Sequence, residues 1–499
     1  MTMATTSSAS AIATVVGPLD FTTFSNIIDG KRSDTEISRY GINPATNEPL
    51  FPAPVSTPAD VHAAIAAARV ASKTWKKSSV EDRKKRLREL SAALISYKAE
   101  FARLLTTEQG KPTVFAEQEV DFGAYWLAGT CELDLPEQVV EGSAERFVRT
   151  RYVPLGVAVG IVPWNFPIML LCGKLGPALL TGNTIIIKPS PFTPYCGIKI
   201  VELAQCYFPA GVVQVLSGDD NLGPWLTAHP GIDKISLTGS TATGKRVMES
   251  ASRNLTRVTL ELGGNDAAIV CADVDVDTVA GQVAQAAFLN SGQICIAIKR
   301  VYVHANIYIA FRCAFVNHVA ALKVGNGFEP GTFLGPVQNK LQYERVQVFL
   351  EDAAKQNQSV LTGGSVLESS EGDTDKGRGF FVQPTVIDNP SDDSKIVVEE
   401  PFGPVVPLLQ WSGVEEVIAR VNASDMGLGA SVWTKDRSLA VRIAEELDVG
   451  SVWVNEHLSI RPTAAFAGHK KSGIGSEWGV DGLKAYCNTQ TIFSHKASE

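Results

Sequence analysis

The chain has 499 residues, of which 45% are hydrophobic and 20% are charged, and its net charge is −8. This composition excludes wholesale disorder, and at roughly 150 residues per domain the length predicts two to four lobes rather than one core. Because positive and negative residues are mixed along the chain, no basic footprint for nucleic acid is present and no nucleic-acid partner is expected.

Residues 1–18 are rich in Ser, Thr and Ala, and we expect them to form a disordered tail. They lack both the basic start of a secretory signal and the arginines of a transit peptide. The eight cysteines include no CxxC pair and no zinc-ligand spacing. We therefore expect free thiols, a cytoplasmic location and no metal site.

The front of the chain is predicted to be helical. Thr57 is expected to be the N-cap of a helix, with Asp60 completing a capping box. A second, strongly charged helix is predicted from about residue 80 to about residue 105, because leucines recur there at helical spacing.

From residue 152 onward, short apolar runs alternate with helical stretches, which predicts a parallel sheet with crossover helices. The expected strands are 157–162, 184–187, 212–216, 235–237 and 267–270. Ligands of such sheets bind at the carboxyl ends of the strands, so the loops that follow these strands are the candidate binding loops.

Two segments imitate other classes of protein. The charge-free stretch 152–173 is long enough for a membrane span, but its three prolines would leave backbone groups unpaired in lipid, so no membrane partner is expected. Residues 239–245 read GxxxxGK after a strand, yet Arg246 replaces the Ser or Thr that binds magnesium in an NTPase. The loop can still receive a phosphate at its helix N-terminus.

A second alternating region follows residue 295, with strands near 300–303, 405–409 and 451–454 and helices near 308–322 and 340–356. Two further strand-like stretches, 139–153 and 485–494, lie outside both regions and are expected to form an arm for subunit contact. The expected fold is α/β, with two doubly wound parallel-sheet lobes plus a small β oligomerisation arm.

The segments Glu261-Leu-Gly-Gly264 and Gly292-Gln-Ile-Cys295 pair a carboxylate that can act as a base with a cysteine that can act as a nucleophile. A lone cysteine is most often a small buried hydrophobe. Here the preceding residues 290–294 favour a turn, and a turn offers backbone N–H groups to a thiolate or an oxyanion.

Seven segments, in this order, resemble motifs of the aldehyde dehydrogenase superfamily, and the likeness covers residues 25 to 494. The segments are Pro163-Trp-Asn165, Lys188-Pro-Ser190, Thr238-Gly-Ser240, Glu261-Leu-Gly-Gly264, Gly292-Gln-Ile-Cys295, Glu400-Pro-Phe-Gly-Pro404 and Lys470-Lys-Ser-Gly473. The resemblance implies NAD(P)-dependent oxidation of an aldehyde to a carboxylic acid by an enzyme of the hydrolytic, non-acylating type.

The resemblance also implies a catalytic role for each of three residues. Cys295 would attack the carbonyl carbon and give a thiohemiacetal, whose oxyanion Asn165 and the backbone N–H of Cys295 would hold. Loss of hydride would leave a thioester on Cys295. Glu261 would then deprotonate a water that bridges it to the thioester.

For the cofactor, the resemblance implies a set of binding positions spread over both regions. They are Ile161, Pro163, Trp164, Lys188, Ser190, Gly218, Gly239, Ser240, Leu262, Gln342, Glu400 and Phe402. Pro191 stands where the family often has a glutamate that holds the adenosine ribose, and without that charge a 2′-phosphate is less repelled. We therefore expect NAD as the main cofactor, with NADP tolerated.

The positions that match the family's substrate tunnel are all apolar or small. They are Phe166, Leu170, Gly173, Leu289, Ile294, Ile296, Ile460 and Phe466. Since Gly173 replaces a common bulky aromatic, we expect a wide tunnel and an aromatic or medium-chain aliphatic aldehyde. His457 and Arg461 lie nearby and can meet a carboxylated tail, which keeps a semialdehyde substrate open.

The expected cofactor domain comprises residues 19–138 and 155–263, the catalytic domain 264–470, and the oligomerisation arm 139–154 and 471–499. The small-molecule aldehyde is the expected substrate, and a homodimer or homotetramer is the expected assembly. Two further readings stay open: a CoA-acylating dehydrogenase and a catalytically idle structural protein on the same fold. A cysteine hydrolase is disfavoured because no histidine has a motif for the base.

Overall fold

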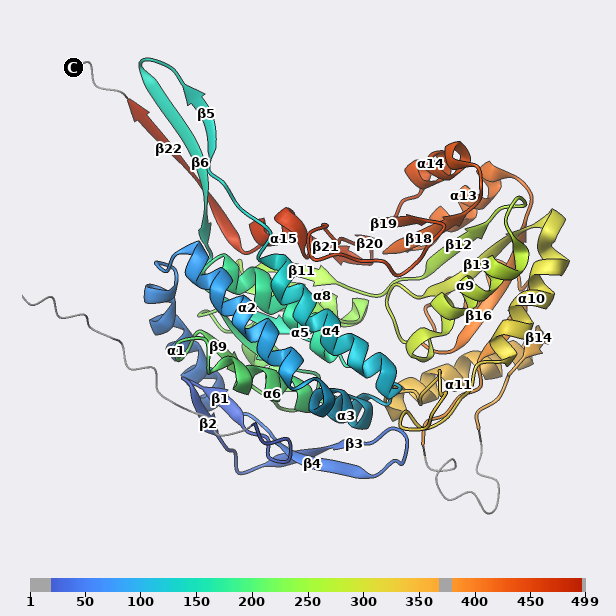
Figure 1. Ribbon diagram of the computed structural model, residues 1–499, viewed down its shortest axis with the longest axis horizontal. Coiled ribbons are helices and arrows are strands. Elements are labelled where there is room, and N and C mark those ends of the chain that lie inside the picture. The colour runs from blue at the N-terminus through green and yellow to red at the C-terminus, as the bar shows by residue number, and fades with distance from the viewer. Residues whose placement is uncertain (1–18, 368–378, 496–499) are drawn as a thin grey trace, which may run out of the picture.

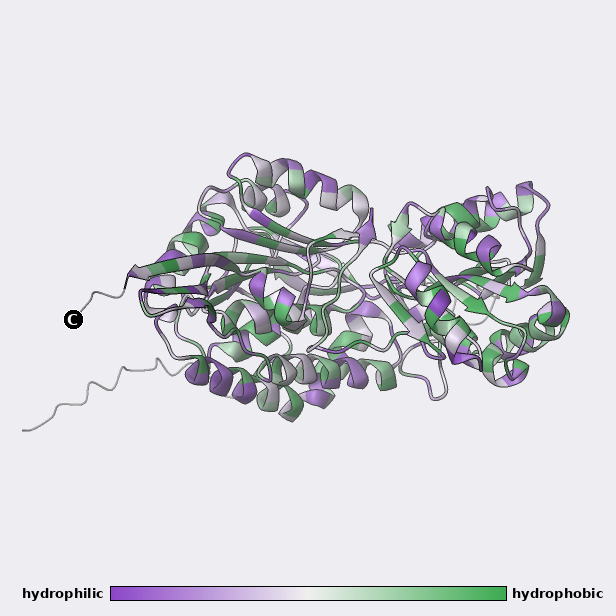
Figure 2. Cartoon of the chain, turned by 90° about the horizontal axis from the view of Figure 1, so that it is seen from above, coloured by the Kyte–Doolittle hydropathy of each residue, from purple (hydrophilic) through white to green (hydrophobic). Residues whose placement is uncertain are grey.

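The computed structural model describes residues 19–367 and 379–495, and the tail expected over residues 1–18 lies outside them. Two lobes, each built on a largely parallel sheet, lie side by side, and a narrow three-stranded sheet projects from the first lobe (Figures 1 and 2). This arrangement confirms the predicted α/β fold with two parallel-sheet lobes.

The first sheet has five central parallel strands: β9 (Val213–Val215), β8 (Thr184–Lys188), β7 (Val157–Ile161), β10 (Lys234–Thr238) and β11 (Arg257–Glu261). Antiparallel edges are added by β1 (Asn26–Ile28) with β2 (Lys31–Ser33), and by β21 (Gly473–Ile474). The chain runs from β7 outward to β9 and then returns to the other side of β7 with β10. This reversal between β7 and β10 makes a switch point, where open α/β sheets bind their ligands.

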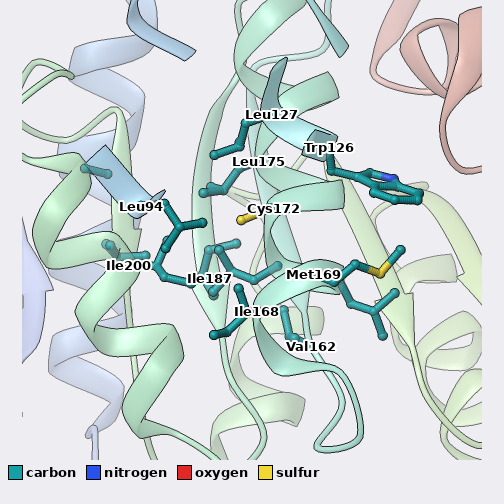
Figure 3. Close-up of a cluster of buried hydrophobic side chains, with 14 of the residues drawn as sticks. Leu94, Trp126, Leu127, Val162, Ile168, Met169, Cys172, Leu175, Ile187 and Ile200 are labelled. Atoms are coloured by element: carbon teal, nitrogen blue, oxygen red, sulfur yellow. The ribbon is translucent and has the colours of Figure 1, made fainter. Parts of the chain in front are cut away.

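Alternate residues of each central strand face opposite layers of helices. Val157 and Val159 pack against α1 (Pro58–Trp75), α7 (Leu222–Thr227) and α8 (Thr241–Ser252). On the opposite face, Ile185 and Ile187 pack in the cluster of Figure 3. The helices of that face are α2 (Val80–Ser96), α3 (Lys98–Gln109), α4 (Thr113–Thr130), α5 (Pro167–Leu180) and α6 (Tyr195–Ala204).

The second sheet follows the same plan. Its strand order is β14 (Ser359–Thr362), β15 (Thr385–Asp388), β16 (Val405–Trp411), β13 (Ile298–His304), β12 (Asp266–Val270), β18 (Gly429–Trp433) and β19 (Ser451–Val454), and all neighbours except β14 and β15 are parallel. One face carries α9 (Val276–Phe288) and α10 (Tyr308–Ala320). The other carries α11 (Lys340–Lys355), α12 (Lys395–Val398), α13 (Val414–Asn422) and α14 (Arg437–Glu446).

The predicted start of the first helix is confirmed, because Thr57 caps α1 and forms a full capping box with Asp60. The single helix predicted over 80–105 is wrong: α2 and α3 are separate helices that break at Tyr97, where φ is −106° and ψ is 22°. The front of the chain is also not all helical. Residues 26–54 form β1 and β2 and the hairpin of β3 (Ser38–Ile42) and β4 (Pro49–Pro54).

The strands expected after residue 152 are all present, but not all in one sheet. β12, expected at 267–270 beside the others, lies in the second sheet between β13 and β18. β11 was not expected, because its first residue is charged and its apolar run is short. The charge-free stretch 152–173 contains the end of β6 (Arg146–Pro154), all of β7 and the start of α5. None of the described helices is long and apolar enough to cross a membrane.

The projecting sheet is formed by β5 (Gln138–Gly142), β6 (Arg146–Pro154) and β22 (Cys487–His495) (Figure 1). Only the last part of the segment expected as arm, 471–499, reaches it. β21 joins the first sheet, and α15 (Gly479–Lys484) packs against α5. A small sheet of β17 (Met426–Gly427) and β20 (His469–Lys470) completes the described part of the fold.

Candidate active site

Five parallel strands of the first sheet end at one edge, and most of the predicted cofactor positions, together with Glu261, lie at those ends. Ile161 ends β7, and Pro163 and Trp164 follow it; Lys188 ends β8, and Ser190 follows it; Gly218 follows β9; Gly239 and Ser240 follow β10; Glu261 ends β11, and Leu262 follows it. The topology therefore brings together residues that are far apart in the sequence.

The central feature of the site is the contact between Cys295 and Glu261. The Sγ of Cys295 lies 3.4 Å from Oε1 of Glu261, and Thr238 Oγ1 donates to the other carboxylate oxygen at 2.8 Å. The thiol and the carboxylate are therefore in direct contact, so Glu261 lies close to the atom that the thioester of the expected reaction would use. Their side chains come from different lobes, β11 in the first and the loop before β13 in the second.

Burial shifts both groups of this pair toward their protonated forms. It raises the pKa of Glu261, with the Lys174 ammonium acting in the opposite direction. Burial, and next the charge of Glu261, raise the pKa of the Cys295 thiol well above its usual value. The thiol is therefore protonated at rest, donates its hydrogen to the carboxylate, and has its proton acceptor already in place.

The loop before Cys295 is held in an unusual backbone conformation. Asn290, Ser291 and Gly292 have φ values of 52°, 57° and 72°, in the left-handed region that Asn and Gly tolerate best. A Cβ on Gly292 would overlap the carbonyl of Gly403, so this position accepts only glycine. The turn predicted from the sequence is present.

Lys299 stabilises the loop that carries Cys295 by binding its backbone carbonyls. Its Nζ donates to the carbonyls of Ile294 at 2.7 Å and Cys295 at 2.6 Å, and it pairs with Glu400 at 3.2 Å. Because these carbonyls turn toward Lys299, the backbone N–H of Cys295 remains available; it donates no hydrogen bond within the described structure. Sequence reasoning missed Lys299, which lies in β13 and is buried.

Asn165 is held beside this loop by a second buried lysine. Nδ2 of Asn165 donates to the Gln293 carbonyl at 2.9 Å, and Lys111 Nζ donates to the carbonyl of Asn165 at 2.9 Å. Lys111 pairs with Glu119, which also accepts from the backbone N–H of Ile168 at 2.9 Å. Sequence reasoning missed this pair, in which both side chains are buried.

Beside Cys295 lies a cavity of about 270 Å³ with mostly apolar walls. Seven of the predicted substrate residues line it: Phe166, Leu170, Leu289, Ile294, Ile296, Ile460 and Phe466. Residues that were not predicted, including Trp126, Met169 and Trp478, complete the wall.

Gly173 is the exception among the predicted substrate residues. A Cβ on Gly173 would lie 2.7 Å from Nε1 of Trp478, so the indole of Trp478 already fills the space over the glycine. The prediction that Gly173 widens the tunnel is therefore wrong, because a residue from the distant C-terminal segment replaces the missing bulk.

The two polar residues expected near a substrate tail have different surroundings. The His457 side chain is buried, and its Nε2 lies 2.7 Å from the carbonyl of Ile296, so that nitrogen donates. Burial lowers the pKa of His457 to about 3, and the neutral ring braces the loop after Cys295 instead of facing substrate. Arg461 is exposed and lines the cavity.

The residues expected on the phosphate side of the cofactor are arranged for an anion. Ser240 caps α8, and its Oγ accepts from the backbone N–H of Thr243 at 3.2 Å. Lys188 is buried at the end of β8, and burial lowers its pKa to about 8. Arg39, which the sequence did not single out, donates from Nη1 to the carbonyl of Gly218 at 3.3 Å. A helix N-terminus after β10, next to the switch point, and two cations near the ends of β8 and β9 fit a dinucleotide.

The residues expected on the nicotinamide side come from the second lobe. Glu400 accepts from the backbone N–H of Gly264 at 3.3 Å, and the Phe402 ring packs edge-on against Trp164 with centroids 5.3 Å apart. Gln342 donates from Nε2 to the carbonyls of Pro401 at 2.8 Å and Phe402 at 3.0 Å. Its amide thus supports the loop that carries Glu400 and Phe402. No group of three or more His, Cys, Asp or Glu side chains in the described ranges is placed to hold a metal ion.

Comparison with known proteins gives one consistent result. The model of the family described as "Aldehyde dehydrogenase family" matches residues 32–492. Aldehyde dehydrogenase LUC3 of Fusarium sp is 40% identical over 478 residues, which are 96% of this chain and 100% of that protein. Phenylacetaldehyde dehydrogenase of Pseudomonas fluorescens is 35% identical, covering 92% of this chain and 93% of that protein. The structure of betaine aldehyde dehydrogenase from Staphylococcus aureus in complex with NAD+ matches with a TM-score of 0.92 at 30% identity, covering 96% of this chain and 97% of that chain.

The raised pKa of the Cys295 thiol predicts its alkylation behaviour in the absence of cofactor. The rate of labelling of Cys295 by iodoacetamide should keep rising beyond pH about 9, because the thiolate forms only above the ordinary thiol pKa. The variant Glu261→Gln removes a neighbouring negative charge and should move this rise to lower pH. Labelling is measured by mass spectrometry of the Cys295 peptide, with Cys295→Ala as the background. A plateau below pH about 8 in the unaltered protein would contradict the burial argument.

Proposed function

The chain belongs to the aldehyde dehydrogenase family, and from that premise we propose how its own residues carry out the oxidation. The protein is an NAD(P)-dependent aldehyde dehydrogenase. The observation that carries the proposal is the contact of the Cys295 thiol with the Glu261 carboxylate at the end of an apolar cavity.

In the first step, Cys295 is the nucleophile. Its thiol proton passes to Glu261, the sulfur forms a bond with the carbonyl carbon of the aldehyde, and the carbonyl oxygen becomes an alkoxide. Nδ2 of Asn165 and the backbone N–H of Cys295 donate to that oxygen. Removing one such donor typically costs about 3 kcal/mol of barrier. The product of this step is a tetrahedral thiohemiacetal on Cys295.

In the second step, the alkoxide re-forms a carbonyl, hydride leaves the same carbon, and a thioester remains on Cys295. Hydride acceptance is the chemistry that a bound nicotinamide supplies. Glu261 next releases its proton and accepts one from the water that attacks the thioester, which frees the acid and restores the thiol. Because the carboxylate touches the thiol directly in this structure, it must withdraw before a water can enter between them.

Residues of both lobes hold the cofactor in this proposal. The domain of residues 19–138 and 155–263 supplies the phosphate-side positions at the switch point, and the catalytic domain, 264–470, supplies Glu400 and Phe402. Glu400 lies against Gly263, where a Cβ would overlap its carboxylate, so the glycine gives this acid its place. NAD is the main cofactor, in line with the NAD+ complex of the structural relative.

NADP should also be accepted, because Pro191 leaves no acidic side chain at this position and Lys188 and Arg39 lie nearby. We expect wild-type kcat/KM values for the two cofactors to differ by less than about a thousandfold. Arg39→Ala should lower kcat/KM for NADP about tenfold, and that for NAD clearly less, since only NADP carries the 2′-phosphate. Reduced-cofactor absorbance at a fixed aldehyde concentration measures both, and an equal loss for both cofactors would contradict this role for Arg39.

The substrate in this proposal is an aromatic or medium-chain aliphatic aldehyde. The cavity walls are apolar and aromatic, and a 35% identical relative is named for phenylacetaldehyde. Benzaldehyde, phenylacetaldehyde and hexanal should each be oxidised with a higher kcat/KM than acetaldehyde, because a larger apolar body buries more surface. The assay follows reduced NAD, and Cys295→Ala should abolish the aldehyde-dependent rate. Activity that survives in Cys295→Ala, or a preference for acetaldehyde, would refute the proposal.

A semialdehyde is the second candidate substrate, and Arg461 favours it. Arg461 lines the cavity, and among the described residues its guanidinium donates one hydrogen bond, from Nη1 to the carbonyl of Ile460 at 3.1 Å. If a carboxylated tail binds there, Arg461→Gln should lower kcat/KM for succinic semialdehyde about tenfold more than that for hexanal. The two rates are compared in the same preparation, and equal effects would reject a semialdehyde site.

The contact of Glu261 with Cys295 supports release of the acyl group to water over release to CoA, and the three catalytic groups together argue against an idle protein.

We also propose a homodimer or homotetramer that pairs through the projecting sheet, whose Val139, Val140 and Phe493 are exposed. All eight cysteines are free, which supports a cytoplasmic location.

A further inference from the structure

One feature of the cavity wall is not explained by the proposed reaction: α5 carries a glycine, Gly173, where the large side chain of Trp478 from the C-terminal segment fills the space. Gly173 on α5 is buried, and a side chain there would collide with the indole of Trp478. Trp478 is 5% exposed, and both the cavity wall and the space over Gly173 are filled by this one ring. The glycine and the tryptophan therefore form a complementary pair.

Trp478 is part of an aromatic wall. Its ring lies 5.0 Å from that of Trp126 in an edge-on arrangement and 5.1 Å from that of Phe466. All three rings line the cavity that contains Cys295. Figure 3 shows Trp126 and Met169 together at one margin of the buried cluster, so this wall is where the hydrophobic core opens into the cavity. Such edge-on and offset arrangements stabilise aromatic groups beyond the area they bury.

Contacts of the neighbouring residues fix the position of the C-terminal segment against α5. Lys174, next to Gly173, makes a buried ion pair of 3.0 Å with Glu477, next to Trp478. Backbone bonds between Phe466 and Glu477, at 2.8 Å in both directions, tie the third ring to the same segment. Two consecutive residues of α5 thus hold two consecutive residues of the C-terminal segment.

The backbone of Trp478 is strained. Its φ is 55° and its ψ is 177°, a conformation that side chains other than glycine rarely adopt. A non-glycine residue persists there only where its surroundings over-determine it, and such strain gathers at functional sites. The strained backbone of Trp478 and the glycine that accommodates its side chain together indicate that the indole has a functional role.

We infer that Trp478, seated over Gly173, is a specificity-determining residue that selects aldehydes with a flat aromatic body. The ring of the substrate packs against the wall of Trp126, Phe466 and Trp478 while its formyl carbon reaches Cys295. A short aliphatic aldehyde gains little from this wall. The inference rests on the proposed oxidation and adds to it the residue pair that shapes the tunnel.

The test compares kcat/KM for phenylacetaldehyde with that for acetaldehyde in each variant, and the ratio of the two is the readout. Trp478→Leu should lower this ratio about tenfold, and Trp478→Phe, which keeps a ring, should restore most of it. Trp75→Leu is the matched control: it also removes a buried indole, 3% exposed, but outside the cavity, and it should leave the ratio unchanged. A merely structural role for Trp478 would lower both rates together and leave the ratio as it is.

Gly173→Ala tests the pairing without removing the indole. Its Cβ pushes the ring of Trp478, so the single change should lower the ratio by a similar factor. Added to Trp478→Leu, where the space is open, Gly173→Ala should change the ratio by less than about twofold. Additive effects of the two changes, or an unshifted ratio in Trp478→Leu, would overturn the inference. Failure of the unaltered protein to oxidise any aldehyde would instead overturn the proposed function, so the two failures are distinct.

Discussion

The contact between the Cys295 thiol and the Glu261 carboxylate is the constraint on which the rest of the structure depends, because it joins the two lobes through a buried carboxylate and a half-buried thiol. Neither group is well solvated, so two negative charges at this distance would be costly. With one proton shared between them, the pair carries one charge at most in the resting protein. The same proximity supplies the nucleophile with its base. The stability of this pair and its proposed reactivity therefore both require that the two lobes hold Cys295 and Glu261 in contact.

The same arrangement holds both Cys295 and Asn165, the proposed nucleophile and oxyanion donor, in place. Lys299 donates to the carbonyl of Cys295 and is paired with Glu400, while Lys111 donates to the carbonyl of Asn165 and is paired with Glu119. In each case a buried ammonium turns a catalytic residue's carbonyl away from the reaction site, and a carboxylate neutralises it. Buried charges are tolerated when they are paired and hydrogen-bonded in this way. The oxyanion donors are thereby oriented before any substrate binds.

Sequence reasoning succeeded where a residue's environment is local. β8 could be predicted because both faces of the strand are buried and its apolar run is continuous, whereas β1 and β2 at the sheet edge are short and give no such run. The break at Tyr97 has no glycine or proline to signal it. Many of the positions predicted for catalysis and for the cofactor lie at or just after strand ends in recognisable motifs, and the structure brings these strand ends to one edge of the first sheet.

The errors in the site arose from partners that are distant in the sequence. Gly173 alone indicates missing bulk, and only the fold shows that Trp478, near the other end of the chain, supplies it. His457 looks like a ligand-binding residue on a loop, but it is buried by its contact with Ile296. Lys111 and Lys299 have no motif, because their function depends on which carbonyls the topology brings to them. A local pattern cannot report such contacts.

The most direct test of the central claim is the fate of the acyl group in Glu261→Gln. This variant is mixed with NAD and phenylacetaldehyde, quenched, and analysed by intact-protein and peptide mass spectrometry alongside the reduced NAD formed. If Cys295 carries the acyl group and Glu261 both accepts the thiol proton and activates the water that frees the acid, one equivalent of reduced NAD per site should form, more slowly than in the unaltered protein, and the phenylacetyl group should then accumulate on the Cys295 peptide. Steady turnover at the unaltered rate, or reduced NAD without an adduct on Cys295, would contradict the division of roles between Cys295 and Glu261.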